Sequence, residues 1–199
     1  GRWFRVAGWD ECFPTIDPYG DSPVMGELVG RPPRMIQEAE SIRQEGRTPH
    51  FTAARRFSLD ASGRLLVSFQ AQNHTPDPQE FLWASHALFP LAGLQAVILP
   101  DGRSLTDFSL DGSEAKWFVE NSRPLVLFRP EGQVILETDQ PWWGIWLNRG
   151  GWPQENPAQL GCIGIEATNT PGEVPAGAWL AVGETFQGRV SLEIRENAI

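Results

Sequence analysis

Two short polar segments of the chain carry the residue types of acid–base chemistry. The first, residues 73–86, holds His74 and His86, two of the three histidines. The second, residues 161–169, places the carboxylate of Glu166 inside an apolar run. A histidine and a desolvated carboxylate are the usual partners in general acid–base catalysis. The two segments are therefore the first candidates for a reaction centre.

Composition favours many short elements that together could carry such groups on a rigid frame. The 199 residues fit one domain, residues 1–199, which is long enough to bury a sizeable core. Twenty glycines and seventeen prolines are spread along the chain and favour turns over long helices. Nine tryptophans can fill a core, and exposed tryptophans can form platforms for the apolar faces of ligands.

The charge balance excludes several classes of partner. The formal net charge is −9, and Lys116 is the only lysine. An acidic chain without a basic stripe argues against nucleic acid. No apolar run approaches the ~20 residues that span a bilayer, and no signal peptide is visible, so we expect no membrane partner. Cys12 and Cys162 form no disulfide framework, and we expect a soluble, cytoplasmic protein.

Alternating patterns predict strands in several places. Residues 51–59 and 64–73 read as a hairpin around a Gly-containing turn. Residues 34–45 follow two prolines and show spacing that fits a helix and a strand equally well. Further strands are predicted at residues 133–138, 142–148, 162–167 and 188–195. We predict a mostly β fold, a sandwich of antiparallel sheets.

The beginning of the chain is unusual. Residues 1–6 already lie within a strand-like pattern, and the dense segment 8–16, with Asp10 and Cys12, follows at once. A segment of this kind so near a terminus suggests that an N-terminal portion is missing.

Four segments together resemble a known group of proteins. Residues 8–16, the stretch from Asn73 through Trp83 to His86, residues 144–148 and residues 164–166 occur in the order of the galactose mutarotase-like (aldose 1-epimerase) superfamily. They are most similar to its shorter bacterial branch. The resemblance covers nearly the whole chain and implies a β-supersandwich, which this chain could carry without its N-terminal part.

The resemblance implies an isomerase of carbohydrate metabolism. Interconversion of sugar anomers requires a base for the anomeric hydroxyl and an acid for the ring oxygen. The ring then opens, the C1–C2 bond rotates and the ring closes on the other face. The substrate would be a monosaccharide or a sugar phosphate. No cofactor is needed, and the histidines lack the spacing of metal ligands.

The superfamily pattern assigns roles to the two central residues. It makes Glu166 the catalytic base, and Ile163 and Ile165 would desolvate its carboxylate and raise its pKa. It makes His86 the acid, because an imidazolium near neutrality can protonate the ring oxygen. The alternatives are a solvated or Arg-paired Glu166 and a buried, hydrogen-bonded His86.

Other residues of these segments are candidates for sugar binding. Trp83 and Trp146 could form an aromatic platform, and Trp9 and Trp143 compete for that role. Amides and carboxylates read hydroxyl groups in a fixed plane. The substrate-binding candidates are therefore Asp10, Asn73, Trp83, Trp146 and Asn148. Asp10 and Glu11 could instead hold a turn or pair with Arg5.

One departure from the superfamily pattern favours other functions. Related sequences often carry His-Gly-Glu where this chain reads Met25-Gly26-Glu27. A thioether cannot supply a charged donor, which puts catalysis in doubt. The alternative is a non-catalytic carbohydrate-binding domain on the same fold. A glycoside-cleaving enzyme is a third possibility that needs paired carboxylates. A chain with an uncovered sheet edge could also form a homodimer.

Overall fold

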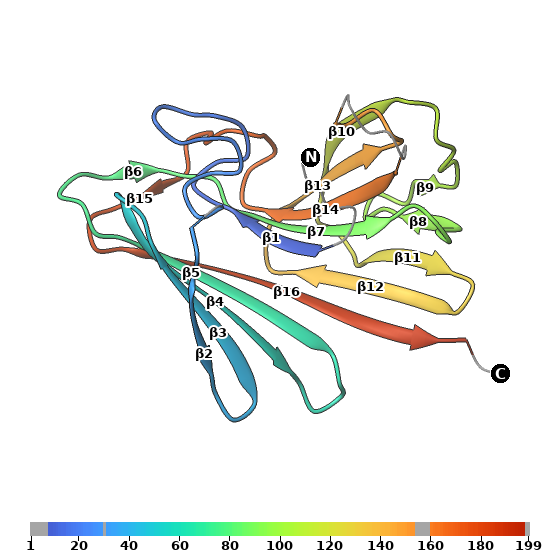
Figure 1. Ribbon diagram of the computed structural model, residues 1–199, viewed down its shortest axis with the longest axis horizontal. Helices are drawn as coiled ribbons and strands as arrows, with labels where there is room; N and C mark the ends of the chain where they lie inside the picture. The colour runs from blue at the N-terminus through green and yellow to red at the C-terminus, as the bar shows by residue number, and fades with distance from the viewer. Residues whose placement is uncertain (1–7, 30, 154–159, 198–199) are drawn as a thin grey trace.

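The computed structural model describes residues 8–29, 31–153 and 160–197. Within these ranges the chain forms sixteen strands and no helix, and almost all strands belong to two antiparallel sheets (Figure 1). None of the described residues forms a helix long and apolar enough to cross a bilayer. The mostly β prediction is confirmed.

The smaller main sheet has five strands in the order β1-β7-β14-β13-β10. Its strands are β1 (Gly8–Cys12), β7 (Ala84–Pro90), β14 (Cys162–Thr168), β13 (Trp142–Asn148) and β10 (Glu114–Glu120). The three central strands were brought together from distant parts of the chain, and every neighbouring pair is antiparallel.

The larger sheet has nine strands in the order β2-β3-β4-β5-β16-β12-β11-β8-β9. These are β2 (Arg34–Gln37), β3 (Ser41–Arg47), β4 (Phe51–Leu59), β5 (Leu65–Asn73), β16 (Thr185–Glu196), β12 (Gly132–Thr138), β11 (Leu125–Arg129), β8 (Ala96–Ile98) and β9 (Ser104–Leu105). A short pair, β6 (Gln79–Glu80) with β15 (Trp179–Leu180), lies at one end of the molecule (Figure 1).

The predicted hairpin at residues 51–73 is confirmed as β4 and β5. Its turn uses Gly63 at a φ of +83°, a value that glycine adopts without steric penalty. Asp60 closes the turn by accepting hydrogen bonds from the backbone of Ser62 and Arg64. Residues 34–45, for which helix and strand were equally favoured, form the hairpin of β2 and β3.

The core fills the space between the two sheets. Side chains alternate along each strand, so one face of each sheet is apolar and meets the other. The five-stranded sheet contributes Ile145, Ile163 and Ile165, all at most 1 % exposed. The nine-stranded sheet contributes Val67, Phe69 and other buried residues. Because this alternation is strict, every second residue of β7 and β14 must lie on the opposite, outer face.

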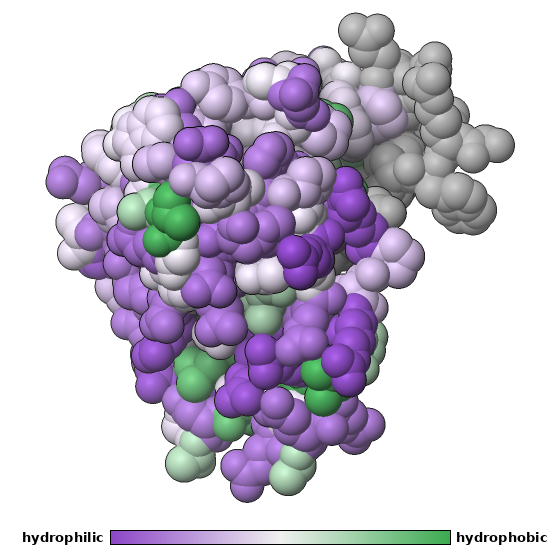
Figure 2. All heavy atoms as spheres, turned by 90° about the vertical axis from the view of Figure 1, so that its left-hand side faces the viewer, coloured by the Kyte–Doolittle hydropathy of each residue, from purple (hydrophilic) through white to green (hydrophobic). Residues whose placement is uncertain are grey.

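The surface at the end of the molecule that carries β2 to β6 is mostly hydrophilic, with hydrophobic side chains scattered singly (Figure 2). Isolated apolar side chains of this kind are normal on a folded protein. This view therefore gives no sign of a broad apolar docking face.

Candidate active site

A row of polar side chains crosses the outer face of the five-stranded sheet. Asp10 of β1 pairs in register with His86 of β7, and His86 pairs with Glu166 of β14. Directly paired residues of antiparallel strands project from the same face and lie close together. The strand register therefore brings together residues that are far apart in the chain.

His86 and Glu166 are in contact. Nε2 of His86 lies 3.3 Å from Oε1 of Glu166, and the two residues are 8 % and 1 % exposed. Two glycines make room for them. A Cβ added at Gly164 would lie 2.8 Å from Nε2 of His86, and one added at Gly144 would lie 3.0 Å from Oε2 of Glu166. The glycines thus allow both side chains to lie against the sheet.

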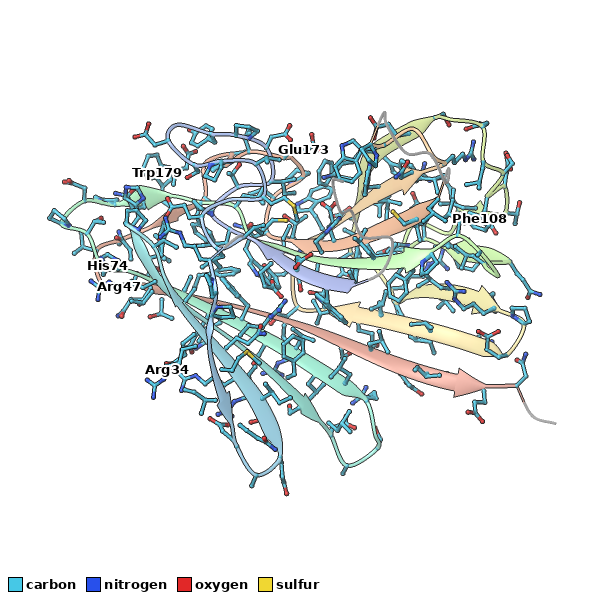
Figure 3. The ribbon with its side chains drawn as sticks, viewed as in Figure 1. Arg34, Arg47, His74, Phe108, Glu173 and Trp179 are labelled. Carbon is cyan, nitrogen blue, oxygen red and sulfur yellow. The ribbon has the colours of Figure 1, made fainter. Side chains whose placement is uncertain are left out.

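Lys116 of β10 completes the cluster. Its Nζ lies 3.0 Å from Oε2 of Glu166 and 2.8 Å from Oε1 of Glu173. Glu173 belongs to the loop after β14 (Figure 3), where its backbone oxygen accepts hydrogen bonds from the backbone of Ile16 and Asp17. The Lys116 ammonium group therefore links Glu166 to the loop that carries Glu173, and backbone hydrogen bonds to Ile16 and Asp17 hold that loop in place.

Burial and charge act differently on the titratable groups of this cluster. Burial lowers the pKa of His86 below its ordinary value, and Glu166 offsets this only in part. Burial also pulls the pKa of Lys116 down, but Glu166 and Glu173 outweigh it and raise that pKa above the ordinary value. Lys116 is thus a fixed positive charge beside Glu166, whereas the imidazole of His86 is mostly neutral at pH 7.

The prediction that Ile163 and Ile165 bury the carboxylate of Glu166 is wrong. Ile163 and Ile165 were expected to desolvate its carboxylate, but both belong to the core on the other face of the sheet. Residues next to each other in a strand point to opposite faces. Glu166 is instead enclosed on its own face, where Gly144, Phe118 and His86 approach it.

The two tryptophans of the predicted platform separate. The ring of Trp146 lies on the outer face, with its centroid 6.2 Å from that of His86, and its Nε1 donates to Glu114. Trp83 is fully buried and stacks on Phe69 in the core, so the structure removes it from the platform. A tryptophan that is buried on all sides cannot stack on a sugar.

The two asparagine candidates stabilise loops. The Nδ2 of Asn73 donates to the backbone oxygens of Asp77 and Leu180, and its Oδ1 accepts from Thr75. Asn148 is engaged in the same way with the backbone of Gly150 and Trp152. Both side chains are at most 1 % exposed and their hydrogen-bonding groups are occupied. Neither residue is therefore free to read a sugar hydroxyl.

The remaining candidates fall into two groups. Asp10 is opposite His86 and stays in the candidate site. His74 lies at the end of β5, away from Glu173, with its Nε2 3.1 Å from the backbone oxygen of Thr48 (Figure 3). His50 pairs with Glu27 through Nδ1. Neither of these histidines joins the cluster.

Met25, which stands where related sequences carry a histidine, has a left-handed backbone with a φ of +62°. Its side chain packs against a small apolar cluster that includes Cys12 and Ala84. These two residues lie on the outer face, two positions along their strands from Asp10 and His86. Burial raises the pKa of the Cys12 thiol well above its ordinary value, so the thiol is inert at neutral pH. The Met25 region is thus an apolar border of the site.

Lys116 is the functional candidate that the sequence pattern missed. The strand 114–120 was not predicted, because Phe118 interrupts the polar face and makes residues 117–119 a continuous apolar run. One signal was present in the sequence, because Lys116 is the only lysine of the chain. In the structure its side chain is 17 % exposed, and lysine is rarely buried unless it is paired. No group of three or more histidine, cysteine, aspartate or glutamate side chains within the described ranges could hold a metal ion.

Solved structures with the same architecture define the class of fold. A galactose mutarotase-like protein from Lactobacillus casei matches with a TM-score of 0.66 at 15 % identity, covering 94 % of this chain and 85 % of that chain. A galactose mutarotase-like protein from Clostridium acetobutylicum gives 0.62 at 12 % identity, with 96 % and 80 % covered.

An enzyme structure is also among the matches. The galactose 1-epimerase from Lactobacillus acidophilus matches with a TM-score of 0.54 at 14 % identity, covering 83 % of this chain and 66 % of that chain. No family model and no curated protein matches the chain. The chain has the galactose mutarotase-like fold, as the motifs predicted.

Proposed function

We propose that the protein is an aldose 1-epimerase-like isomerase that interconverts the anomers of a sugar. The observation that carries this proposal is the contact of His86 with Glu166, 3.3 Å apart on neighbouring strands. His86 is the candidate acid and Glu166 the candidate base, and both lie on the outer face of the five-stranded sheet. The likeness of the fold to structures described as mutarotase-like supports the proposal.

The reaction needs its acid and base side by side. Glu166 takes the proton of the anomeric hydroxyl, whose oxygen then forms a double bond to C1. The bond between C1 and the ring oxygen breaks, and the ring oxygen takes a proton from His86. The two oxygens share C1 and are neighbours. Catalytic groups on neighbouring strands can therefore reach both oxygens of one bound sugar.

Ring closure returns both protons. After rotation about the C1–C2 bond, the ring oxygen attacks the other face of the carbonyl carbon. Glu166 gives its proton to the carbonyl oxygen, and His86 regains the proton of the hydroxyl. No atom is gained or lost, and no cofactor or metal takes part in the proposed steps. Both residues end the cycle in the states in which they began it.

The surrounding residues have supporting roles in this proposal. Lys116 holds the Glu166 carboxylate in place, because its Nζ lies 3.0 Å from Oε2 of Glu166. Trp146 borders His86 and offers an aromatic surface to the sugar ring. Asp10 is the candidate on the other side of His86 for a hydrogen bond to a hydroxyl group.

The remaining expectations belong to the same proposal. We expect residues 1–199 to act as one domain on a monosaccharide or a sugar phosphate in the cytoplasm. A homodimer would pair the edge strand β1 or β10 of the five-stranded sheet with a second copy.

A carbohydrate-binding domain without turnover is the second candidate. It is favoured by Met25 at the place of a histidine and by the near-complete burial of Glu166. Such a domain would bind sugars on the same face through Trp146 and Asp10. It would shift sugar resonances without exchanging them.

Exchange between sugar anomers, measured by NMR with and without protein, tests the proposal. We expect protein-dependent exchange for at least one of glucose, galactose and their 6-phosphates. Glu166→Gln should lower the rate ~10²-fold, because it removes the base and keeps the shape. Glu137→Gln, at a half-exposed carboxylate on the other sheet, is the control and should keep the rate. Exchange that is as fast in Glu166→Gln as in the wild type would contradict the proposal.

A further inference from the structure

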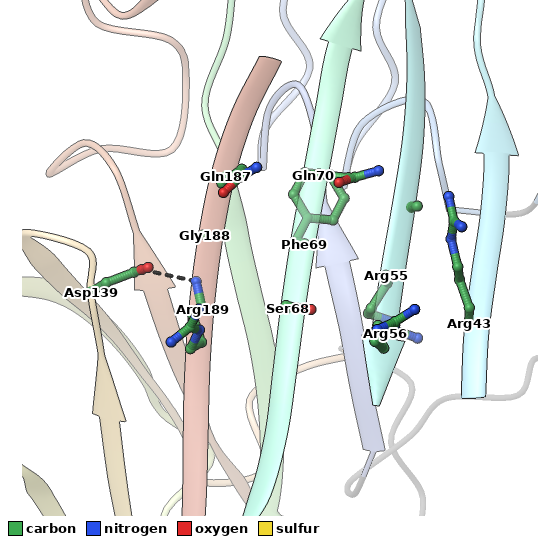
Figure 4. Close-up of a pocket in the computed structure, with 11 residues that line it drawn as sticks. Arg43, Arg55, Arg56, Ser68, Phe69, Gln70, Asp139, Gln187, Gly188 and Arg189 are labelled. Atoms are coloured by element: carbon green, nitrogen blue, oxygen red, sulfur yellow. Dashed lines mark hydrogen bonds between the residues drawn. The ribbon is translucent and has the colours of Figure 1, made fainter. Parts of the chain in front are cut away.

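A polar hollow of about 370 Å³ lies on the outer face of the nine-stranded sheet, which the proposed function does not use. Four strands, β3, β4, β5 and β16, form its floor (Figure 4). Its central row is set by register: Arg43 pairs with Arg56, Arg56 with Ser68, and Ser68 with Arg189. These four side chains therefore project from the same face.

The hollow exists because short side chains lie between long ones. Ala54 and Ser68 stand in the middle of the four strands, and arginine and glutamine side chains surround them. In the next row Gln70 lies directly opposite Gln187. Neither amide makes a hydrogen bond with the described part of the chain, so both keep their donors and acceptors for a ligand.

The charge of the hollow is opposite to that of the chain. Four of its five charged residues are arginines and the fifth is Asp139, although the whole protein carries a net charge of −9. Arg55 is the inward-facing one and binds Gln44 and Glu11. The other three arginines face outward.

The outward arginines differ in how they are paired. Arg43 pairs with Glu45, and Arg56 pairs with Glu38. The guanidinium of Arg189 has no partner within the described ranges. No ion pair joins Asp139 to this guanidinium within those ranges; the Oδ1 of Asp139 accepts the backbone N–H of Arg189 (Figure 4) and a side-chain N–H of Gln140. Arg189 is thus the group best placed to bind an anion.

We propose that this hollow binds a sugar unit that carries an anionic group, either a phosphate or a carboxylate. Arg189, with Arg43 and Arg56 beside it, would hold the anion through the planar donors of guanidinium groups. Gln70, Gln187 and Ser68 would bind hydroxyl groups. A volume of about 370 Å³ is at the lower end of ligand pockets, as a single sugar unit requires.

Titration of the full chain with four probes tests the inference. Glucose 6-phosphate, glucuronate, glucose and inorganic phosphate are each added while protein amide shifts or calorimetric heats are recorded. We expect glucose 6-phosphate or glucuronate to bind at least tenfold more tightly than glucose and than inorganic phosphate. The first two probes distinguish a phosphate from a carboxylate ligand.

Matched variants locate the binding. Arg189→Met should weaken binding of the anionic sugar at least tenfold. Arg195→Met, six residues along the same strand and paired with Glu193, should not. Gln187→Ala should weaken binding of the sugar but not of inorganic phosphate. Glu166→Gln should leave the binding unchanged, so failure of the proposed epimerase function and failure of this inference are distinguishable.

Three outcomes would overturn the inference. No binding of either anionic sugar at millimolar concentration would remove the site. Equal binding of inorganic phosphate and glucose 6-phosphate would show an anion patch without sugar recognition. Binding that is unchanged in Arg189→Met would place the ligand elsewhere.

Discussion

Two buried carboxylates lie on opposite faces of the same five-stranded sheet. Glu11 of β1 is on the inner face and 7 % exposed, and Glu166 of β14 is on the outer face and 1 % exposed. Burial does not distinguish them. The side chains that contact them do, and the proposed function assigns a structural role to Glu11 and a catalytic role to Glu166.

Glu11 accepts hydrogen bonds from three side chains on the inner side of the sheet. Nε1 of Trp83 donates to it over 2.7 Å, the hydroxyl of Ser85 over 3.0 Å and Nη1 of Arg55 over 3.3 Å. Glu166 instead contacts an imidazole and an ammonium group, on a face where two glycines leave space for the side chains. In the proposed function these two titratable neighbours are what suit Glu166, and not Glu11, to act as the base.

The largest expected effect concerns stability at Glu11. Burial raises its pKa from 4.5 to about 7, while Arg55, Ser85 and Trp83 act in the opposite direction. Between these two pH values the folded carboxyl keeps its proton and the unfolded one releases it. The folded state then binds more protons, so stability falls as pH rises through this window.

Denaturant unfolding between pH 4 and 8 measures this effect. The wild type should lose on the order of 3 kcal/mol more than Glu11→Gln between pH 4.5 and 7. Glu137→Gln, at an exposed carboxylate, should follow the wild type. Parallel curves for the wild type and Glu11→Gln would refute the assignment of Glu11 as a buried carboxyl that titrates near neutrality.

The second prediction tests the role of the Lys116 ammonium group beside Glu166. Lys116→Met removes the only lysine or arginine that contacts this carboxylate among the described residues, so the positive charge that holds the carboxylate in place is lost. We expect the rate of anomer exchange at pH 7 to fall ~10-fold. Lys116→Arg should restore most of it, because the positive charge is kept. A merely structural lysine would lower stability in both variants and leave the rate per folded molecule unchanged.

The smallest effect is on the shape of the pH–rate profile. The acid form of His86 becomes populated only as pH falls below 6.5, because burial lowers the pKa of its imidazole. Exchange should therefore rise by a few fold as pH falls from 7.5 towards 6. An exchange rate that increases steadily up to pH 8 would contradict His86 as the acid.

The sequence predicted the strands where alternation is clear. The hairpin of β4 and β5 was found because apolar and polar residues alternate on either side of a turn, and strand β13 because it is a short apolar run. Strand β10 was missed although its charged residues share one face, because Phe118 on that face makes residues 117–119 a continuous apolar run. Residues 34–45 were ambiguous because only the neighbouring strand β4 decides that they form a hairpin.

The site was predicted in part for a related reason. His86 and Glu166 were predicted as site residues from the resemblance to a family. Their mutual contact could not be predicted, because it depends on the pairing of β7 with β14, two strands that are far apart in the sequence. Trp83 and Asn73 looked similar to Trp146 as ligand-binding residues. Their burial depends on the other sheet and on the loop at residues 180–184, which no local pattern reveals.

The central claim is that Glu166, and not Glu11, acts on substrate. Glu166→Gln and Glu11→Gln should be measured side by side by NMR exchange between sugar anomers, with each rate divided by the folded fraction. We expect a ~10²-fold loss for Glu166→Gln and an unchanged rate for Glu11→Gln. Equal rates in the two variants, or a loss confined to Glu11→Gln, would contradict it.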